Sequence, residues 1–225
     1  MFDDEPVGGA CNDPNGGSAS VVPVTDHNGA AGAAVAVIAN ADGQPGRYTQ
    51  ANLYRTLSET ASLDGVITLT VSTLVPIGSE TLGPEIQIAS NTLHGKPAGF
   101  VHNDIAAVRL NVQSGTLEFW TGDAPAQWEP IGPMTVTRGA WITIKLRANF
   151  DTRTYASINF EGSVNSSIDM SGRTLGRRAQ LWLHDSATVS VESANRQDHG
   201  CPANGGPFGP GTVLYDDLQV SQDRR

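Results

Sequence analysis

Short runs of alternating apolar and polar residues, separated by turn-forming residues, are the feature that most restricts how this chain can fold. In the run Val66–Ser72, Ile, Leu and Val side chains alternate with hydroxyl side chains, so each kind occupies its own face of a strand. Gly and Pro number 25 and 13 of the 225 residues, and no stretch keeps a helical period over several turns. We therefore predict an all-β chain of about a dozen short strands.

The predicted strands fall along the whole chain. Most have one apolar face, so two antiparallel sheets should pack face to face as a β-sandwich. A chain of this length can form one core, and we expect a single domain over residues 1–225. Gly8–Gly32 and Gly122–Gly132 are predicted to be loops, and Tyr48–Thr56 an edge strand or a helical turn. The predicted strands are Phe2–Gly8, Ala33–Ala39, Val66–Ser72, Glu85–Ala89, Ala107–Val112, Thr116–Trp120, Trp141–Phe150, Arg153–Phe160, Ala179–His184, Ser186–Glu192 and Val213–Val220.

The charge of the chain argues against a nucleic-acid partner, and its lack of long apolar runs argues against membrane insertion. The formal net charge is −9, and no cationic cluster exceeds Arg177-Arg178 or Arg224-Arg225. Because neutralised phosphates supply most of the affinity for nucleic acid, we expect no nucleic-acid partner. No apolar run reaches the roughly 18 residues of a membrane-spanning helix, so we expect no membrane insertion.

The start of the chain leaves two export routes open. Met-Phe-Asp-Asp-Glu is acidic and lacks the basic and apolar regions of a signal peptide. The chain is then either a mature secreted domain with an added Met, or a protein made in the cytoplasm and exported by assembly into a virus particle. Both routes predict an extracellular or virion-surface location.

The two cysteines, Cys11 and Cys201, lie in Gly-, Asn- and Pro-rich stretches near the two ends of the chain. A disulfide between them would close a very long loop and stabilise the fold by about 4–5 kcal/mol in the chain-entropy model. The alternative is two unrelated buried thiols. Isolated loop thiols would be exposed, which favours the disulfide and an oxidising final location.

Three stretches carry a resemblance to a known family. The opening Phe2-Asp3-Asp4-Glu5, the hairpin Trp141–Gly162 and the closing Leu214–Val220 resemble the concanavalin A-like lectin/glucanase jelly roll, which includes laminin-G-like modules. The resemblance implies a bent two-sheet sandwich whose first and last strands are neighbours, which would bring Cys11 and Cys201 together. It does not select a function, because lectins, glycan-cleaving enzymes, adhesion modules and viral surface proteins share this fold.

The acidic pairs near the two ends are candidate metal ligands. In several branches of the family a structural calcium joins the first and last strands, so the resemblance implies a Ca²⁺ site at some subset of Asp3, Asp4, Asp216 and Asp217. Carboxylates and backbone carbonyls are the oxygen ligands that Ca²⁺ requires. The alternative is that these acids keep a sheet edge from pairing with another chain.

A second candidate site is the outward face of the central strands, identified by period two. If these strands adjoin, tryptophans could stack on sugars while amide and charged groups bind hydroxyls; the alternative is an ordinary solvated sheet face. Residues placed on this face are Glu85, Gln87, Arg109, Asn111, Gln113, Glu118, Trp120, Lys145, Arg147, Tyr155, Ser157, Asn159, Gln180, Trp182 and His184. The candidate ligand-binding residues among them are Gln87, Arg109, Asn111, Glu118, Trp120, Lys145 and Trp182.

The sequence gives weaker support to the hypothesis that the chain is an enzyme. The Glu-x-Asp-x-x-Glu pattern of retaining glycosidases on this fold is absent, and Glu85-Ile-Gln-Ile-Ala offers one carboxylate. A polysaccharide lyase needs a group that neutralises the uronate and a Tyr or His for proton transfer, roles that Gln87, Arg109, Tyr155 and His184 could fill. An enzyme of this kind is therefore expected to be a lyase rather than a hydrolase.

These observations favour a non-enzymatic module on an exterior surface. It would act either as a lectin-like glycan-binding domain or as a decoration or surface protein of a virion, such as a bacteriophage head or tail. Its partners would be a glycan or a protein assembly such as a capsid or tail. The alternative is a secreted polysaccharide lyase or another glycan-cleaving enzyme on the same fold.

Overall fold

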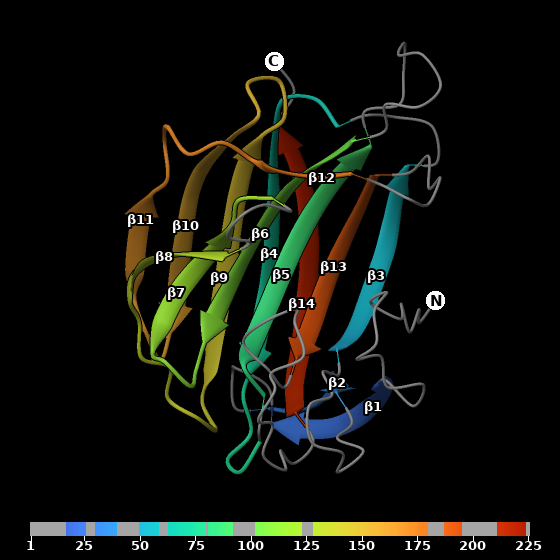
Figure 1. Cartoon of the computed structure of the whole chain (residues 1–225). Helices are drawn as coiled ribbons and strands as arrows, with labels where there is room; N and C mark the ends of the chain where they lie inside the picture. The colour runs from blue at the N-terminus through green and yellow to red at the C-terminus, as the bar shows by residue number, and fades with distance from the viewer. Residues whose placement is uncertain are drawn as a thin grey trace, which may run out of the picture.

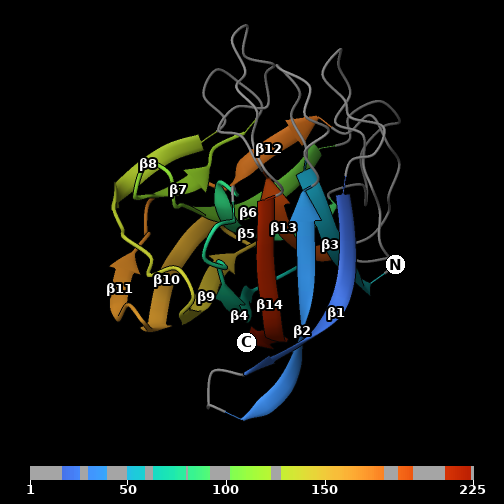
Figure 2. The ribbon, with the colours of Figure 1, turned by 90° about the horizontal axis from the view of Figure 1, so that it is seen from below.

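A computed structural model describes residues 17–25, 30–39, 50–58, 63–79, 81–91, 102–122, 128–179, 187–194 and 211–223. This part of the chain contains fourteen β-strands and no helix, which confirms the all-β prediction. The strands form two seven-stranded antiparallel sheets that lie against each other as two layers (Figures 1 and 2). Within these ranges there is no helix long and apolar enough to cross a membrane.

One layer, which we name the β5 sheet, carries the candidate site. Its path is β3-β13-β5-β6-β7-β8, and β12 pairs with the first half of β6. Every pairing in it is antiparallel. Its strands are β3 (Gln50–Ser58), β5 (Gly83–Asn91), β6 (His102–Asn111), β7 (Thr116–Trp120), β8 (Trp128–Pro133), β12 (Gly176–Ala179) and β13 (Ala187–Ala194).

The other layer, the β4 sheet, has the order β1-β2-β14-β4-β9-β10-β11. The last strand, β14, lies in the middle of this layer between β2 and β4. Its strands are β1 (Gly17–Thr25), β2 (Ala31–Ala39), β4 (Val66–Leu74), β9 (Trp141–Asn149), β10 (Thr154–Gly162), β11 (Ser166–Asp169) and β14 (Gly211–Asp223).

The core lies between the two layers and follows the predicted alternation. Ile86 and Ile88 of β5 meet Leu69 and Val71 of β4 in one apolar cluster, and all four are buried. Burying side chains of this size contributes about 1.5–3 kcal/mol each relative to leaving them in water. Because successive side chains along a strand point to opposite faces, Glu85 and Gln87, on either side of Ile86, point away from the core.

Several elements differ from the sequence prediction. The predicted loop Gly8–Gly32 contains β1, and the predicted loop Gly122–Gly132 contains the start of β8. Both strands carry prolines, such as Pro23 in β1, which mask the strand signal. Proline is tolerated there because each strand has one partner within the described residues and so lies at a sheet edge. β3 confirms the edge-strand option for Tyr48–Thr56.

The predicted seam between the two ends of the chain is not tested. The predicted strand Phe2–Gly8 and both cysteines, Cys11 and Cys201, lie outside the described residues. The closing stretch Leu214–Val220 falls inside β14, as predicted. The adjacency of the first and last strands and the disulfide stay predictions.

Candidate functional site

Four charged side chains form a row across the outer face of the β5 sheet, the face turned away from the β4 sheet. Strand register places Glu192 of β13 opposite Glu85 of β5, Glu85 opposite Arg109 of β6, and Arg109 opposite Glu118 of β7. We name these four residues the carboxylate row. They occupy this face because they alternate with core residues such as Ile86. All four are nevertheless at most 7% exposed, so their charges are held away from bulk water.

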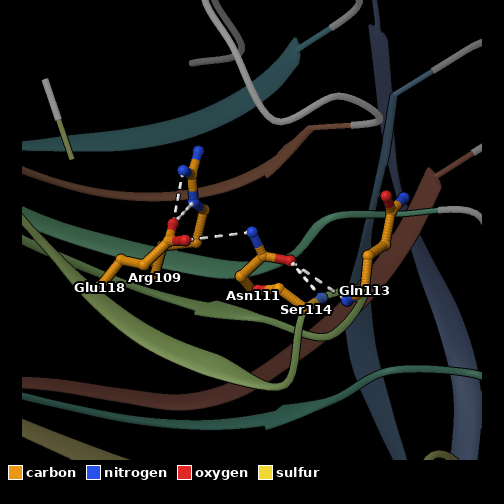
Figure 3. Close-up of polar contacts among 5 residues, drawn as sticks. All are labelled: Arg109, Asn111, Gln113, Ser114 and Glu118. Atoms are coloured by element: carbon orange, nitrogen blue, oxygen red, sulfur yellow. Dashed lines mark hydrogen bonds and ion pairs between the residues drawn. The ribbon is translucent and has the colours of Figure 1, made fainter. Parts of the chain in front are cut away.

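Arg109 and Glu118 form the ion pair of the row. The Nε and Nη2 atoms of Arg109 both donate to Oε2 of Glu118, at 2.9 and 2.6 Å. Asn111 Nδ2 donates to the other carboxylate oxygen at 3.2 Å, while its own side-chain oxygen accepts from the backbone N–H groups of Gln113 and Ser114 (Figure 3). The turn between β6 and β7 thus orients Asn111, and Asn111 with Arg109 fixes the Glu118 carboxylate.

Glu85 and Glu192 form the second half of the row. Burial raises the pKa of the Glu85 carboxyl well above its usual value, and the Glu192 charge raises it further. Arg109 opposes this rise, whereas Glu118 and a side-chain hydrogen bond with Glu192 add to it. Two buried carboxylates side by side repel each other, so Glu85 keeps its proton to a higher pH than an exposed glutamate.

A tyrosine from the opposite sheet hydrogen-bonds to the backbone of both residues of this pair. Tyr215 of β14 crosses the core, and its hydroxyl donates to the backbone oxygen of Glu192 and accepts from the backbone N–H of Glu85, the latter at 3.2 Å. Desolvation raises the pKa of Tyr215 well above its usual value, so the hydroxyl stays protonated as a donor. Tyr215 therefore ties β5 to β13 where the two glutamates meet.

Aromatic side chains border the row on the β7–β8 side. The rings of Trp120 and Trp128 meet edge to face, with 5.5 Å between their centroids. The guanidinium carbon of Arg109 lies 4.3 Å from the centroid of Trp128, a cation–π contact. Trp120 also packs with small apolar residues of the same face, including Ala107. The outer face is thus charged along one row and has an apolar cluster beside it on β6 and β7.

The structure brings together most of the predicted ligand-binding residues. Arg109, Asn111, Glu118 and Trp120 lie on the outer face of neighbouring strands, as the period-two pattern predicts. Gln87 lies on the same face one row away from Glu85, half-buried, opposite Ala107 and a serine of β13. These residues form one contiguous patch on β5, β6 and β7.

Other predicted residues do not join this patch. Lys145 and Arg147 belong to β9, whose inward residues face the core, so they point outward from the opposite side of the sandwich. Lys145 is exposed there. Period two finds outward residues but not the sheet to which each strand belongs. Trp182, His184 and Gln180 lie outside the described residues, so their placement stays a prediction.

Tyr155 is not on the outward face, contrary to the prediction. It is 1% exposed, and its hydroxyl donates to the backbone oxygens of Ala107 and Trp120 and accepts from the Ala107 N–H. A β-bulge shifts the register of β10 between Tyr155 and Ser157, so these residues do not share a face despite their spacing. Burial raises the pKa of Tyr155, and its contacts are structural.

The predicted calcium ligands are only partly described. Asp216 and Asp217 lie in β14, at a register shift that begins after Asp216. The backbone N–H of Asp217 donates to the Asp216 carboxylate at 2.8 Å, and Asp217 has a positive φ of 50°. Asp3 and Asp4 lie outside the described residues. No group of three or more metal-binding side chains occurs in the described part of the chain, and the calcium site stays a prediction.

Glu192 is a site residue that was not among the predicted ones. It lies at the end of the predicted strand Ser186–Glu192, in which Val189 and Val191 face the core. This alternation is the sequence signal that could have placed Glu192 on the outward face. Nothing in the sequence indicated that β13 would pair with β5 and so place Glu192 beside Glu85. The two carboxyl groups of this pair come from neighbouring strands rather than from one strand.

Comparisons with known proteins identify the fold. No family model and no curated protein matches the sequence. An endo-β-1,4-glucuronan lyase from Trichoderma reesei aligns over 99% of this chain and 90% of its own, with 13% identity and a TM-score of 0.51. A carbohydrate esterase from the Shiga toxin-encoding bacteriophage phi24B aligns over 93% and 91%, with 14% identity and a TM-score of 0.51. The chain has the concanavalin A-like jelly-roll fold.

Proposed function

We propose that this protein is a glycan-cleaving enzyme whose reactive groups lie in the carboxylate row. The observation that carries the proposal is the buried Glu85 carboxyl, which holds its proton beside Glu192 on the outer face of the β5 sheet. Strongly shifted pKa values with a specific charged neighbour are typical of functional sites. The proposal favours the enzyme alternative over the non-enzymatic module. A location outside the cell, free or on a virion, remains part of it.

The protonation of Glu85 suits cleavage of a glycosidic bond. Such cleavage needs a carboxylic acid that protonates the leaving oxygen, and a raised pKa keeps this acid neutral near neutral pH. Glu192 hydrogen-bonds with Glu85, so these two carboxyl groups are too close to flank a sugar linkage. Glu118 lies two strands from Glu85, a backbone separation of about 9.6 Å at usual strand spacing. Strands at that backbone separation can hold two carboxyl groups roughly 6.5–9.5 Å apart, the spacing found in inverting glycosidases.

Hydrolysis fits the described residues better than β-elimination does. Tyr155, one of the two proton-transfer candidates of the predicted lyase set, is buried in the core and bonded to backbone atoms, while the other, His184, lies outside the described residues. Arg109, the predicted neutraliser of a uronate, already gives two hydrogen bonds to Glu118. We therefore assign Glu85 as the general acid and Glu118 as the second carboxylate of an inverting hydrolase.

The proposal is tested on a panel of polysaccharides by measuring new reducing ends and, separately, the absorbance of unsaturated products. We expect reducing ends without unsaturated products. Glu85→Gln should lower turnover by about 10²–10⁴-fold, the usual contribution of a general acid. Lys145→Gln, on the exposed face of the other sheet, is the matched control and should leave turnover unchanged.

Three outcomes contradict the hydrolase. Unsaturated products would identify a lyase. Glycan binding without turnover would support the lectin-like alternative, and neither binding nor turnover would favour particle assembly. Product anomers followed by NMR during the first turnovers check inversion.

A further inference from the structure

We propose that Asn111 is a positioning residue that keeps the Glu118 carboxylate ionised and oriented, so that Glu118 can serve as the general base. This inference rests on the proposed function, in which Glu118 is the second carboxylate of a hydrolase. It is carried by the hydrogen bonds of Asn111 and by a comparison with Asn149, which lies in the same kind of turn elsewhere in the chain.

Asn111 is placed to act through Glu118 rather than to touch a glycan. It is 1% exposed, and both its side-chain oxygen and its side-chain nitrogen have partners (Figure 3). The oxygen accepts from the backbone N–H groups of Gln113 and Ser114, both at 3.1 Å, so the β6–β7 turn fixes the orientation of the amide. The nitrogen is thereby directed at Oε1 of Glu118, at 3.2 Å.

Asn149 shows what a turn of this kind requires by itself. It ends β9 as Asn111 ends β6, and its side-chain oxygen accepts from the backbone N–H groups of Asp151 and Thr152 at 3.0 and 3.2 Å. Both asparagines therefore cap a hairpin turn through the oxygen atom, a role that aspartate fills equally well. At position 111 the amide nitrogen also donates to a carboxylate, so there the amide has a use beyond the turn.

The two donors leave Glu118 able to hold a water molecule. Arg109 gives both of its hydrogen bonds to Oε2, and Asn111 gives one to Oε1. A carboxylate oxygen can accept two hydrogen bonds, so Oε1 can accept one more. In an inverting hydrolysis the water passes its proton to this carboxylate while its oxygen bonds to the anomeric carbon, and the Glu85 proton passes to the leaving oxygen.

The charges around Glu118 show why the hydrogen bond from the amide matters. In the described part of the chain, the charged side chains that share the row with Glu118 are Arg109, Glu85 and Glu192. On the other side, β8 places the uncharged Pro130 opposite Glu118, and its Glu129 lies opposite the core residue Phe119. Arg178 of β12, whose side chain lies outside the described residues, pairs with the far end of β6. A hydrogen bond donated to the carboxylate therefore adds to the single arginine in favouring its ionised form.

The test compares Asn111→Asp with Asn149→Asp. Both variants keep an oxygen that can accept from the turn, but only Asn111→Asp replaces the donor to Glu118 with a second carboxylate, which favours the protonated form of Glu118. The Glu118 carboxyl is followed by ¹³C NMR titration, and kcat and KM are measured over the same pH range. In Asn111→Asp we expect the Glu118 titration and the acidic limb of kcat to move up by about one pH unit. Asn149→Asp should leave both unchanged.

Asn111→Ser covers the case in which a buried aspartate prevents folding. Its hydroxyl can still cap the turn, but it is too short to reach Glu118. It should lower kcat per folded molecule by about tenfold, the usual effect of losing one hydrogen bond to a charged group. KM should stay unchanged, because Asn111 does not contact the substrate.

The outcomes separate this inference from the proposed function. A Glu118 titration that is the same in the wild type and in both Asn111 variants overturns the positioning role, whether or not turnover occurs. A shifted titration without turnover of any polysaccharide supports the positioning role and overturns the enzyme. If turnover occurs and its pH profile and kcat per folded molecule are unchanged in both variants, Asn111 only caps the turn and the inference is overturned.

Discussion

Glu192 lies directly opposite Glu85 on the neighbouring strand, and their carboxyl groups hydrogen-bond within a buried face. Buried charges seldom stabilise a fold, and replacing them with apolar groups is often neutral or stabilising. The sheet is therefore less stable when both carboxyls are ionised than when Glu85 keeps its proton. This raised proton affinity of Glu85 is what the proposed acid catalysis would use.

The first prediction concerns stability against pH. The folded pKa of Glu85 is raised, so the folded protein binds the proton more tightly than the unfolded chain does. The stabilisation is then complete below the usual glutamate pKa of 4.5 and is lost as pH rises towards the folded pKa. The loss is about 1.4 kcal/mol per pH unit between those two values. Urea unfolding from pH 4 to 8 measures it.

Glu85→Gln is the variant that isolates this effect, because its side chain is neutral at every pH. Relative to the wild type, its free energy of unfolding should rise as the pH increases through the same window. A constant difference between the two proteins at all pH values would show that Glu85 does not titrate with a raised pKa.

A second prediction concerns the buried ion pair. Arg109→Met leaves the Glu118 carboxylate buried without its cation and should destabilise the fold by about 3–5 kcal/mol. The double variant Arg109→Met/Glu118→Gln should recover much of that loss. The exposed pair Arg147 and Asp223, with atoms 3.2 Å apart, is the control and should contribute about 0–1 kcal/mol. Additive single effects at Arg109 and Glu118 in a double-mutant cycle would contradict the coupling.

A third prediction separates two tyrosines. Tyr155→Phe removes hydrogen bonds to buried backbone groups and should destabilise the fold by about 1–3 kcal/mol, with turnover per folded molecule unchanged. Tyr215→Phe should cost similar stability and also move the pH profile of kcat, since its hydroxyl holds the backbones of Glu85 and Glu192. A loss of turnover in Tyr155→Phe at wild-type stability would restore it as a lyase candidate.

A fourth prediction tests the packing beside the site. A Cβ at Gly176 would lie 2.2 Å from a Trp120 ring carbon, so Gly176→Ala should destabilise the fold by about 1–3 kcal/mol and change tryptophan fluorescence. Gly132→Ala is the control. Gly132 lies in β8, next to the strand β7 that carries Trp120, and has open space for the new methyl group. Equal thermal midpoints for the two variants would show that Trp120 is not held against Gly176.

Much of the fold could be predicted from local patterns. The period-two alternation identified β4, β5, β9 and β13, and correctly put Arg109, Glu118 and Trp120 on an outward face. The alternation gave a wrong or missing assignment where a strand contains a bulge or prolines. The bulge in β10 reversed the face of Tyr155, and prolines concealed β1. A bulge has no reliable sequence signal, because it depends on the pairing partner as well as on the strand.

The sequence by itself determined that this chain is an all-β sandwich and which side chains avoid its core, because side-chain direction along a strand is a local property with a period of two. Only the tertiary structure decided which strands are neighbours. It placed Glu192 beside Glu85 and sent Lys145 to the opposite side of the sandwich. Strand order depends on long-range packing of complete faces, so the site, and the burial that shifts the pKa of Glu85, exist only once the two sheets have assembled.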